Sequence, residues 1–189
     1  IIVESPSKIN TLKKYLGNEY EIEASVGHIR DLVKSKLGLD VDNGFKPTYA
    51  VTDDRSKKVV NNLKSSIKGI DTIYIATDPD REGEAIAWHL VELLKPKIPV
   101  KRLAFHEITK AAIQESFDHI RDIDSSLVSA QEARRILDRL WGYQVSAKLW
   151  KNLGAKRNEP SWKASLTSKS QTSTIYSRHG WTAYIEMTK

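Results

Sequence analysis

The fold is decided by the stretch Ile73-Tyr74-Ile75-Ala76-Thr77-Asp78-Pro79-Asp80-Arg81-Glu82-Gly83-Glu84. Its first part, together with the preceding threonine, is an uncharged and largely apolar run, which is typical of a strand buried in a parallel sheet. A helical pattern follows, with apolar residues at 86, 90 and 93 on one face and Pro96 beyond its end. A buried strand that leads through an acidic turn into a helix predicts a βαβ unit.

The same alternation of strands and helices extends over the first hundred residues. Strands are predicted at 1–3, 20–24, 72–76 and 100–105, and helices at 8–16 and 56–68 and after Glu84. Two more helices are predicted, one from Thr109 and one over 125–143, where Ser129 and Glu132 have capping-box spacing. The sequence therefore predicts an α/β fold with a mostly parallel sheet flanked by helices, followed by a helical segment.

Composition limits the class of protein. The chain has 189 residues, 40% of them hydrophobic, which is enough for a core and excludes wholesale disorder. No apolar run approaches the ~20 residues of a membrane span. Cysteine is absent, which excludes disulfides and thiolate sites and is compatible with a cytoplasmic location. The chain begins at Ile1 rather than Met, so we expect a partial chain.

The net charge of +6 is weak evidence for nucleic-acid binding by itself. Residues 154–189 carry +4 of that charge and form an atypical tail that is rich in serine and threonine and has no persistent periodicity. A nucleic-acid site must therefore be argued from particular residues.

Acidic residues follow the predicted strand at 72–76. In an open parallel sheet, ligands bind beyond the carboxyl ends of the strands, and residues two apart in an extended segment project the same way. We therefore expect Asp78 and Asp80 to direct two carboxylates at one point, with Glu82 or Glu84 close behind. Such carboxylates repel one another unless a cation or a raised pKa relieves them, and an all-oxygen ligand set suits Mg²⁺. The alternative is that they only favour the N-terminus of the following helix.

Glu4 has the same placement after the first predicted strand. Its carboxylate lies next to Ser5-Pro6 at the start of a helix and is a candidate general acid or base. The alternative is that it only complements the helix dipole. Lys8, one turn into that helix, is a candidate phosphate ligand or else an ordinary surface lysine.

Five segments of the chain resemble the motifs of type IA DNA topoisomerases, and among these the bacterial members. They are IVESPSK at 2–8, SVGHIRDL at 25–32, ATDPDREGEAIAWH at 76–89, FHEIT at 105–109 and QEARRILDRLWGY at 131–143. They occur in family order and cover the chain from residue 1 to about 153.

The resemblance implies a Toprim domain at residues 1–109 and the start of the family's helical DNA-binding domain at 110–153. In that family a strand-end glutamate and an Asp-x-Asp-x-Glu set bind Mg²⁺. Carried over to this chain, the implied metal ligands are Glu4, Asp78, Asp80 and Glu82. The resemblance also implies that Glu4 handles the proton of the 3′-oxygen and that Lys8 holds the scissile phosphate.

The resemblance further implies DNA, mainly single-stranded, as the partner, with no membrane and no small-molecule cofactor. The implied DNA-contacting residues are His28, Arg134, Arg135, Arg139, Tyr143 and Lys151. Arg135 and Arg139 would contact backbone phosphates, and Tyr143 would stack on a base. The residues alone leave other readings open. These are an Arg134–Asp138 ion pair at i,i+4 spacing, core positions for Trp141 and Trp150, and structural roles for His89 and His106.

The family relaxes negatively supercoiled DNA by a transesterification. A tyrosine attacks the phosphodiester and forms a 5′-phosphotyrosine, and strand passage and religation follow. This chain departs from the family pattern from residue 154 onward, which we interpret as a truncated, foreign or frameshifted tail. We therefore expect that it lacks most of the gate domains and does not complete the cycle alone.

One tail segment, Gly180 to Tyr184, is similar to the sequence around the family's nucleophile. Glu186 stands where the family has an arginine, and its charge would repel the scissile phosphate. This argues against Tyr184 as the nucleophile.

Two other functions are open to such a chain. The first is a non-catalytic Toprim-type nucleic-acid-binding module. The second is a phosphatase with an Asp-x-Asp nucleophile, but Arg81-Glu82 stands where those enzymes have a small, hydroxyl-bearing context, and Glu4 would have no role.

Overall fold

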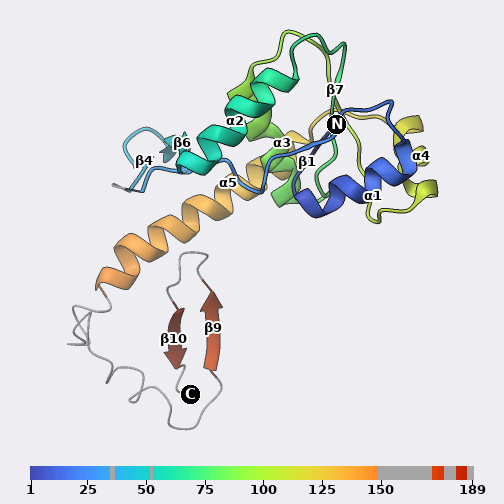
Figure 1. Cartoon of the computed structure of the whole chain (residues 1–189). Helices are drawn as coiled ribbons and strands as arrows, with labels where there is room; N and C mark the ends of the chain where they lie inside the picture. Colours follow the sequence, from blue (N-terminus) through green and yellow to red (C-terminus); the bar gives the residue numbers. More distant parts are fainter. Residues whose placement is uncertain (35–36, 52, 149–171, 177–181, 187–189) are drawn as a thin grey trace. The chain divides into compact units, whose positions relative to one another are not determined.

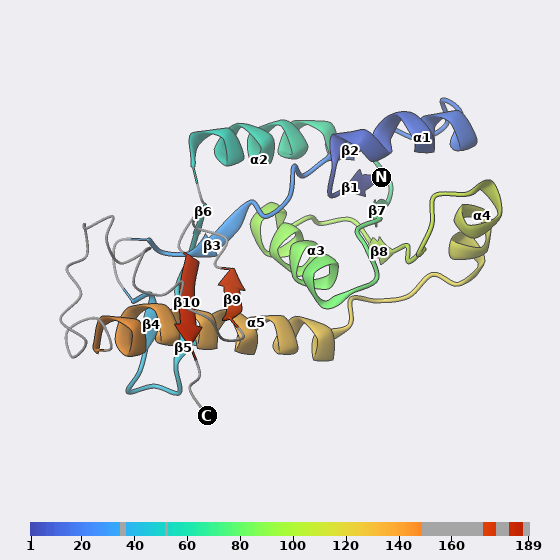
Figure 2. The same ribbon diagram turned by 90° about the horizontal axis from the view of Figure 1, so that it is seen from below.

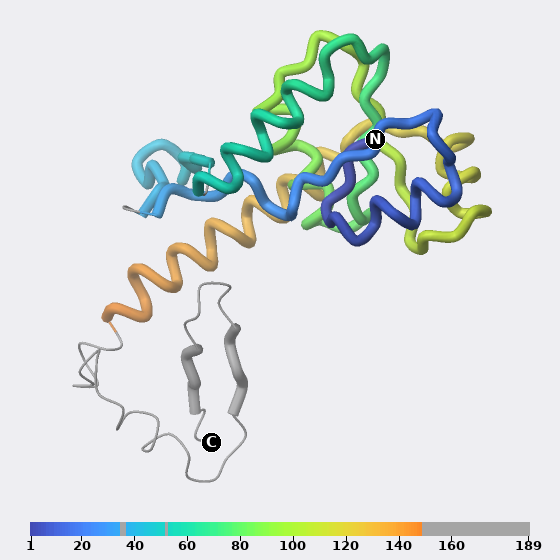
Figure 3. The backbone as a smooth tube through the Cα atoms, viewed as in Figure 1, coloured from blue at the N-terminus to red at the C-terminus, as the bar shows by residue number. Residues whose placement is uncertain are grey.

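A sheet of four short parallel strands organises the first part of the chain (Figure 1). A computed structural model describes residues 1–34, 37–51, 53–148, 172–176 and 182–186. The strand order is β2-β1-β7-β8, with β1 at Ile2–Val3, β2 at Glu23–Ala24, β7 at Ile73–Ile75 and β8 at Val100–Arg102. Ile2 is opposite Ile75, so the N-terminal residues lie beside a strand some seventy residues later, as the trace in Figure 3 shows. The α/β prediction with a mostly parallel sheet is confirmed.

The helices lie between and after these strands. They are α1 (Pro6–Leu16), α2 (Asp54–Ser66), α3 (Arg81–Leu94), α4 (Lys110–Asp118) and α5 (Ser125–Leu140), and α5 continues into a π-helical turn at Trp141–Val145. Two small antiparallel pairs precede α2: β3 (Arg30–Leu32) with β6 (Tyr49–Val51), and β4 (Leu39–Asp40) with β5 (Lys46–Pro47). Among the described residues, no helix is long and apolar enough to cross a membrane.

Helices cover both faces of the sheet, which gives two hydrophobic clusters (Figure 2). Residues of α2 and α3, such as Leu63 and Leu90, pack with Ile73 and Ile75 on one face. On the other face, Leu12 of α1 and Ile113 of α4 pack with Val3. Burial of each apolar side chain of this size stabilises the fold by about 1.5–3 kcal/mol before conformational entropy is counted. The sheet is thus buried on both sides, as its uncharged central strand predicts.

The described residues divide into two compact units, 1–136 and 137–189. In the second unit, β9 (Thr172–Tyr176) pairs with β10 (Thr182–Glu186) in an antiparallel hairpin. The sequence showed no persistent pattern there, so this hairpin was not predicted. The domain boundaries at 109 and 153 stay predictions, and residue 153 lies outside the described residues.

The predicted elements are present, but several limits differ. The strands predicted at 20–24 and 100–105 are shorter, at Glu23–Ala24 and Val100–Arg102. The capping box at residues 129–132 is wrong, because α5 begins at Ser125. Its cap is Asp124, whose Oδ1 accepts hydrogen bonds from the N–H groups of Ser126 and Leu127 at 2.8 and 3.2 Å.

We predict that Gly83→Ala destabilises the protein. A Cβ at this position in the first turn of α3 would lie 2.0 Å from the carbonyl oxygen of Asp78, a backbone atom that has little room to move. The expected loss is about 1–3 kcal/mol of unfolding free energy, as for other overpacked sites, measured by urea denaturation. Gly142→Ala is the matched control, because nothing lies within 4 Å of its Cβ. Equal stability of the two variants would contradict the prediction.

Candidate functional site

Glu4 lies at the carboxyl end of β1, at the point where the chain turns into α1. The turn is set by Ser5, the N-cap residue, whose side chain accepts a hydrogen bond from the N–H of Ser7, and by Pro6 at the first helical position. Glu4 is therefore held between a buried strand and a helix N-terminus. Its side chain is only 18% exposed.

Asp78 lies at the corresponding end of β7, and the backbone around it is tightly held. Its N–H donates to Oε2 of Glu4 at 3.3 Å, which links the two strand ends directly. The hydroxyl of Thr77 donates to the carbonyl of Gly83 at 2.7 Å and closes the turn into α3. Glu4 and Asp78 therefore lie together at one edge of the sheet.

Asp80 and Glu82 have different positions from Asp78. Oδ1 of Asp80 accepts from the N–H of Gly83 at 2.7 Å, so Asp80 is the N-cap of α3. Glu82 is a partly buried residue in the first turn of that helix. The alternative reading of these acidic residues, that they favour the helix N-terminus, thus holds for Asp80.

Lys8 joins the two strand ends. Its Nζ lies 2.5 Å from Oε1 of Glu4 and 2.5 Å from Oδ1 of Asp78, which is 70 residues away in the sequence. Its side chain is 17% exposed. Lys8 is therefore not an ordinary surface lysine.

These contacts shift two pKa values. Burial alone would lower the pKa of Lys8, but hydrogen bonds to Asp78 and Glu4 outweigh it and raise that pKa above its usual value. Burial would raise the pKa of Asp78, but the hydrogen bonds with Lys8 and Glu4 and the nearby charges of Lys8 and Arg102 together outweigh burial and lower that pKa. Both groups are charged at neutral pH.

A buried arginine hydrogen-bonds the backbone at this edge of the sheet. Arg102 of β8 donates to the backbone carbonyls of Ile75 at 3.0 Å and Asp78 at 2.8 Å, and also to that of Leu103. Its Nε donates to Oε1 of Glu84 at 3.0 Å, and both side chains are 0% exposed. Arg102 thus holds the backbone that carries Asp78.

The carboxylate of Glu84 is used in contacts within the protein rather than in binding a metal. Besides Arg102, it accepts from Nη2 of Arg121 at 2.5 Å and from the N–H of Asp124 at 3.0 Å. Sequence reasoning missed Arg102 and Arg121. The one available signal was the charged pair Lys101-Arg102 inside the predicted strand at 100–105.

Glu4 and Asp78 fit a cation, because their oxygens approach a common positive charge and all-oxygen donors suit Mg²⁺. Among the described residues, no three His, Asp or Glu side chains are grouped as a metal site as they stand. Two contacts separate the carboxylates: Lys8 lies between Glu4 and Asp78, and Asp80 turns toward its own helix.

The predicted DNA-contacting residues are spread over β3 and α5. Arg135 is paired with Asp31 of β3, with Nε 2.9 Å from Oδ1 and Nη2 on Oδ2. Arg139 is buried at 7% exposure, and its guanidinium lies 5.2 Å from the ring centre of Tyr143. Tyr143 itself is exposed at 47%, as a base-stacking residue would have to be.

The other predicted residues are described less fully. His28 is partly buried just before β3, and Arg134 is exposed on α5. Lys151 lies outside the described residues, and Tyr184 belongs to β10, where only the backbone is described. The assignment of His28, Arg134 and Lys151 to DNA stays a prediction, and the question of Tyr184 as the nucleophile is likewise untested.

An aromatic cluster lies next to β3. The guanidinium of Arg30 lies 5.0 Å from the ring centre of Tyr49 and 5.1 Å from that of Trp88, and its Nε donates to Nδ1 of His89 at 2.9 Å. Tyr49 in turn donates to Glu132 of α5 at 2.8 Å. Burial, together with the charge of Arg30, lowers the pKa of His89 to about 3. His89 is thus a structural residue, as the sequence favoured.

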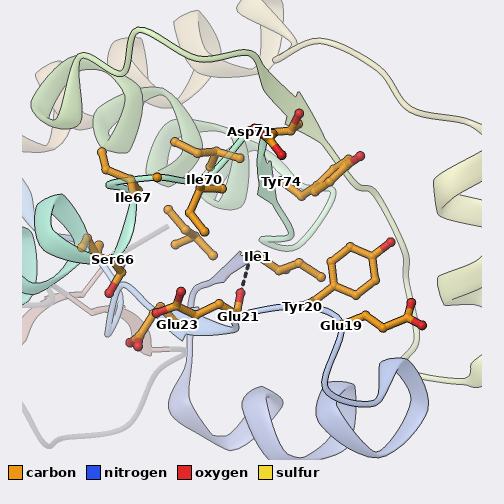
Figure 4. A pocket seen from close by; sticks show the side chains of 15 residues that line it. Ile1, Glu19, Tyr20, Glu21, Glu23, Ser66, Ile67, Ile70, Asp71 and Tyr74 are labelled. Carbon is orange, nitrogen blue, oxygen red and sulfur yellow. Dashed lines mark hydrogen bonds between the residues drawn. The ribbon is translucent and has the colours of Figure 1, made fainter.

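A cavity of about 320 Å³ lies at the opposite edge of the sheet, where β1 and β7 begin (Figure 4). Tyr20, Ile70 and Tyr74 contribute to its walls, and the amino group of Ile1 donates to the carbonyl of Glu21 at 2.6 Å. None of the predicted metal, phosphate or DNA residues lines it.

Residues 1–108 match the Toprim domain family, and the parallel sheet flanked by helices is the α/β fold that the sequence led us to expect. The chain belongs to this family. More particularly, it is 54% identical over 166 residues to DNA topoisomerase 1 of Streptomyces coelicolor and 50% identical over 170 residues to DNA topoisomerase 1 of Mycolicibacterium smegmatis. These alignments cover 81% and 82% of this chain but only 17% and 18% of the relatives.

A solved structure of a topoisomerase I is also similar to this chain. Full-length topoisomerase I from Thermotoga maritima has a TM-score of 0.71 and 49% sequence identity, over 79% of this chain and 25% of that one. The predicted resemblance and fold are confirmed.

We predict that His89 makes the protein less stable in mild acid. The pKa of His89 is about 3 in the folded state and about 6.5 in the unfolded chain, so the unfolded state gains a proton first as the pH falls. The expected loss is about 1.6 kcal/mol of unfolding free energy between pH 6.5 and pH 5, measured by urea denaturation.

His89→Gln, which retains an acceptor for Arg30, should lose much less over this interval. The exposed His106→Gln is the matched control and should behave like the unsubstituted protein. The same pH slope in all three proteins would contradict the role of His89.

Proposed function

We propose that this chain is the Mg²⁺-binding and DNA-binding Toprim portion of a type IA DNA topoisomerase, which relaxes negatively supercoiled DNA. The observation that carries the proposal is the convergence of Glu4, Lys8 and Asp78 at the carboxyl ends of β1 and β7. The similarity to DNA topoisomerase 1 proteins from several bacteria supports it. A cytoplasmic location, with access to DNA, belongs to the same proposal.

Each residue has a role in the proposed reaction. Glu4, Asp78, Asp80 and Glu82 would hold Mg²⁺, which would offset the negative charge on the scissile phosphate. Glu4 takes the proton from the 3′-hydroxyl during religation and returns it during cleavage. Lys8 holds the scissile phosphate by charge. The nucleophilic tyrosine comes from another part of the enzyme, so we propose that residues 1–148 do not complete the cycle alone.

The DNA part of the proposal rests on α5. Arg134, Arg135 and Arg139 contact backbone phosphates upstream of the cut, and Tyr143 stacks on a base. His28 and Lys151 add further contacts. We propose single-stranded DNA as the ligand, because aromatic stacking needs an unpaired base.

Magnesium binding separates this proposal from a non-catalytic nucleic-acid-binding module. We predict that Asp78→Asn with Asp80→Asn weakens Mg²⁺ binding about tenfold or more, because two of the four proposed carboxylates lose their charge. Asparagine still caps a helix, so α3 should remain folded. Isothermal titration calorimetry with MgCl₂ measures the effect.

The matched control is Asp40→Asn with Asp42→Asn, which removes an exposed pair of the same spacing. Unchanged Mg²⁺ affinity in the Asp78/Asp80 variant would refute the metal site and favour the non-catalytic module.

Salt dependence tests the DNA contacts. We predict that Arg135→Ala with Arg139→Ala weakens binding to single-stranded DNA and reduces the slope of log K against log salt by about 1.4, the value for two lost phosphate contacts. The measurement is fluorescence anisotropy with a labelled oligonucleotide at several salt concentrations. The control Lys13→Ala with Lys14→Ala removes the same charge from α1 and should leave the slope nearly unchanged. If both double variants keep the original slope, the arginines serve only to hold α5.

A further inference from the structure

The ammonium of Lys8 occupies the place between the two strand-end carboxylates. Its Nζ is 2.5 Å from an oxygen of Glu4 and 2.5 Å from one of Asp78, so these oxygens are no more than about 5 Å apart. The surroundings are partly shielded, since the side chains of Lys8 and Glu4 are 17% and 18% exposed. The side chain of Asp78 is 50% exposed, so one positive charge faces two negative charges at a site that is only partly shielded from water.

We propose that Lys8 and Mg²⁺ are alternative counter-ions for Glu4 and Asp78, so that Mg²⁺ displaces Lys8 from the carboxylates when it binds. The inference rests on the proposed metal site and adds to it a competition that lowers its affinity for metal. Two cations do not share the same pair of oxygens at these distances, because their mutual repulsion is then at its strongest.

The fold permits this exchange without moving the backbone. Lys8 lies in the first turn of α1, four residues after Glu4. The start of this helix is fixed separately, by the Ser5 cap and by Pro6. The four-carbon stem of a lysine is flexible, so a change of rotamer withdraws the ammonium. α1 is also held by Leu12, which is buried in the cluster with Val3, so its position has support besides the ion pair.

The competition also couples the metal to the substrate. A phosphate that attracts the Lys8 ammonium away from Glu4 and Asp78 leaves their charge unbalanced and so increases their affinity for Mg²⁺. By thermodynamic linkage, Mg²⁺ increases the affinity for the phosphate by the same factor. The charge of Lys8 thus suppresses metal binding until DNA is present.

The test is the Mg²⁺ affinity of Lys8→Met in the full chain, measured by calorimetry without DNA. We expect binding about tenfold tighter than in the unsubstituted protein, because the competing charge is gone. Lys8→Arg keeps the charge and should retain the original affinity, and Lys13→Met, on the exposed end of α1, is the matched control. Equal or weaker binding by Lys8→Met, with Lys8→Arg unchanged, overturns the competition.

A second measurement needs no substitution. Reductive methylation followed by peptide mass spectrometry reports the reactivity of each lysine. We expect Mg²⁺ to increase the rate at Lys8 severalfold and to leave the rate at Lys13 unchanged. No change at Lys8 in a protein that binds Mg²⁺ overturns the inference but leaves the proposed function intact. If neither the unsubstituted protein nor Lys8→Met binds Mg²⁺, both the inference and the metal site of the proposed function fail.

Discussion

The parallel pairing of β1 with β7 is the constraint on which the candidate site depends. Ile2 lies opposite Ile75, so the two strands end at the same edge of the sheet. Glu4 and Asp78, which are 74 residues apart, are then close enough for a direct hydrogen bond. Closing so long a loop has an entropic cost that increases only slowly with length, and the apolar packing on both faces of the sheet offsets it. Hydrophobic burial thus positions charged groups that would otherwise repel each other.

The buried Arg102–Glu84 pair has a second role in this arrangement. Removing two charges from water costs several kcal/mol for each ion, so such a pair is weak evidence for net stability. The pair instead fixes the geometry of the backbone. The planar guanidinium of Arg102 donates to a carbonyl of β7 and to one in the turn that follows it. Burial lowers the pKa of Arg102 from its ordinary value, yet the group stays charged because Glu84 compensates it. The backbone beneath Asp78 is therefore fixed by geometry rather than by packing alone.

The sequence predicted those helices and strands that are determined by a few neighbouring residues. The uncharged run at 72–76 and the Ser5-Pro6 cap produce patterns that can be recognised within a few residues, and the structure has β7 and α1 there. The β3–β6 pair was not predictable in this way, because each strand has three residues and their partners are some twenty residues apart. The pairing of Arg135 with Asp31 is more distant still, at 104 residues. The resemblance singled out Arg135 as a DNA contact but gave Asp31 no role, and it did not predict their contact.

The acidic segment after β7 shows why residue type alone did not separate the roles of its members. Asp78 faces Glu4 and Lys8, Asp80 caps α3, and Glu84 is buried against two arginines. Three carboxylates within seven residues therefore have three environments, set by the change from an extended chain to a helix. Serine or asparagine would cap the helix as well as Asp80 does. Only aspartate also adds a negative charge and a second oxygen at this edge of the sheet, which is what a cation site requires. The proposed metal site thus accounts for the aspartate at a position where the helix alone would accept a neutral residue.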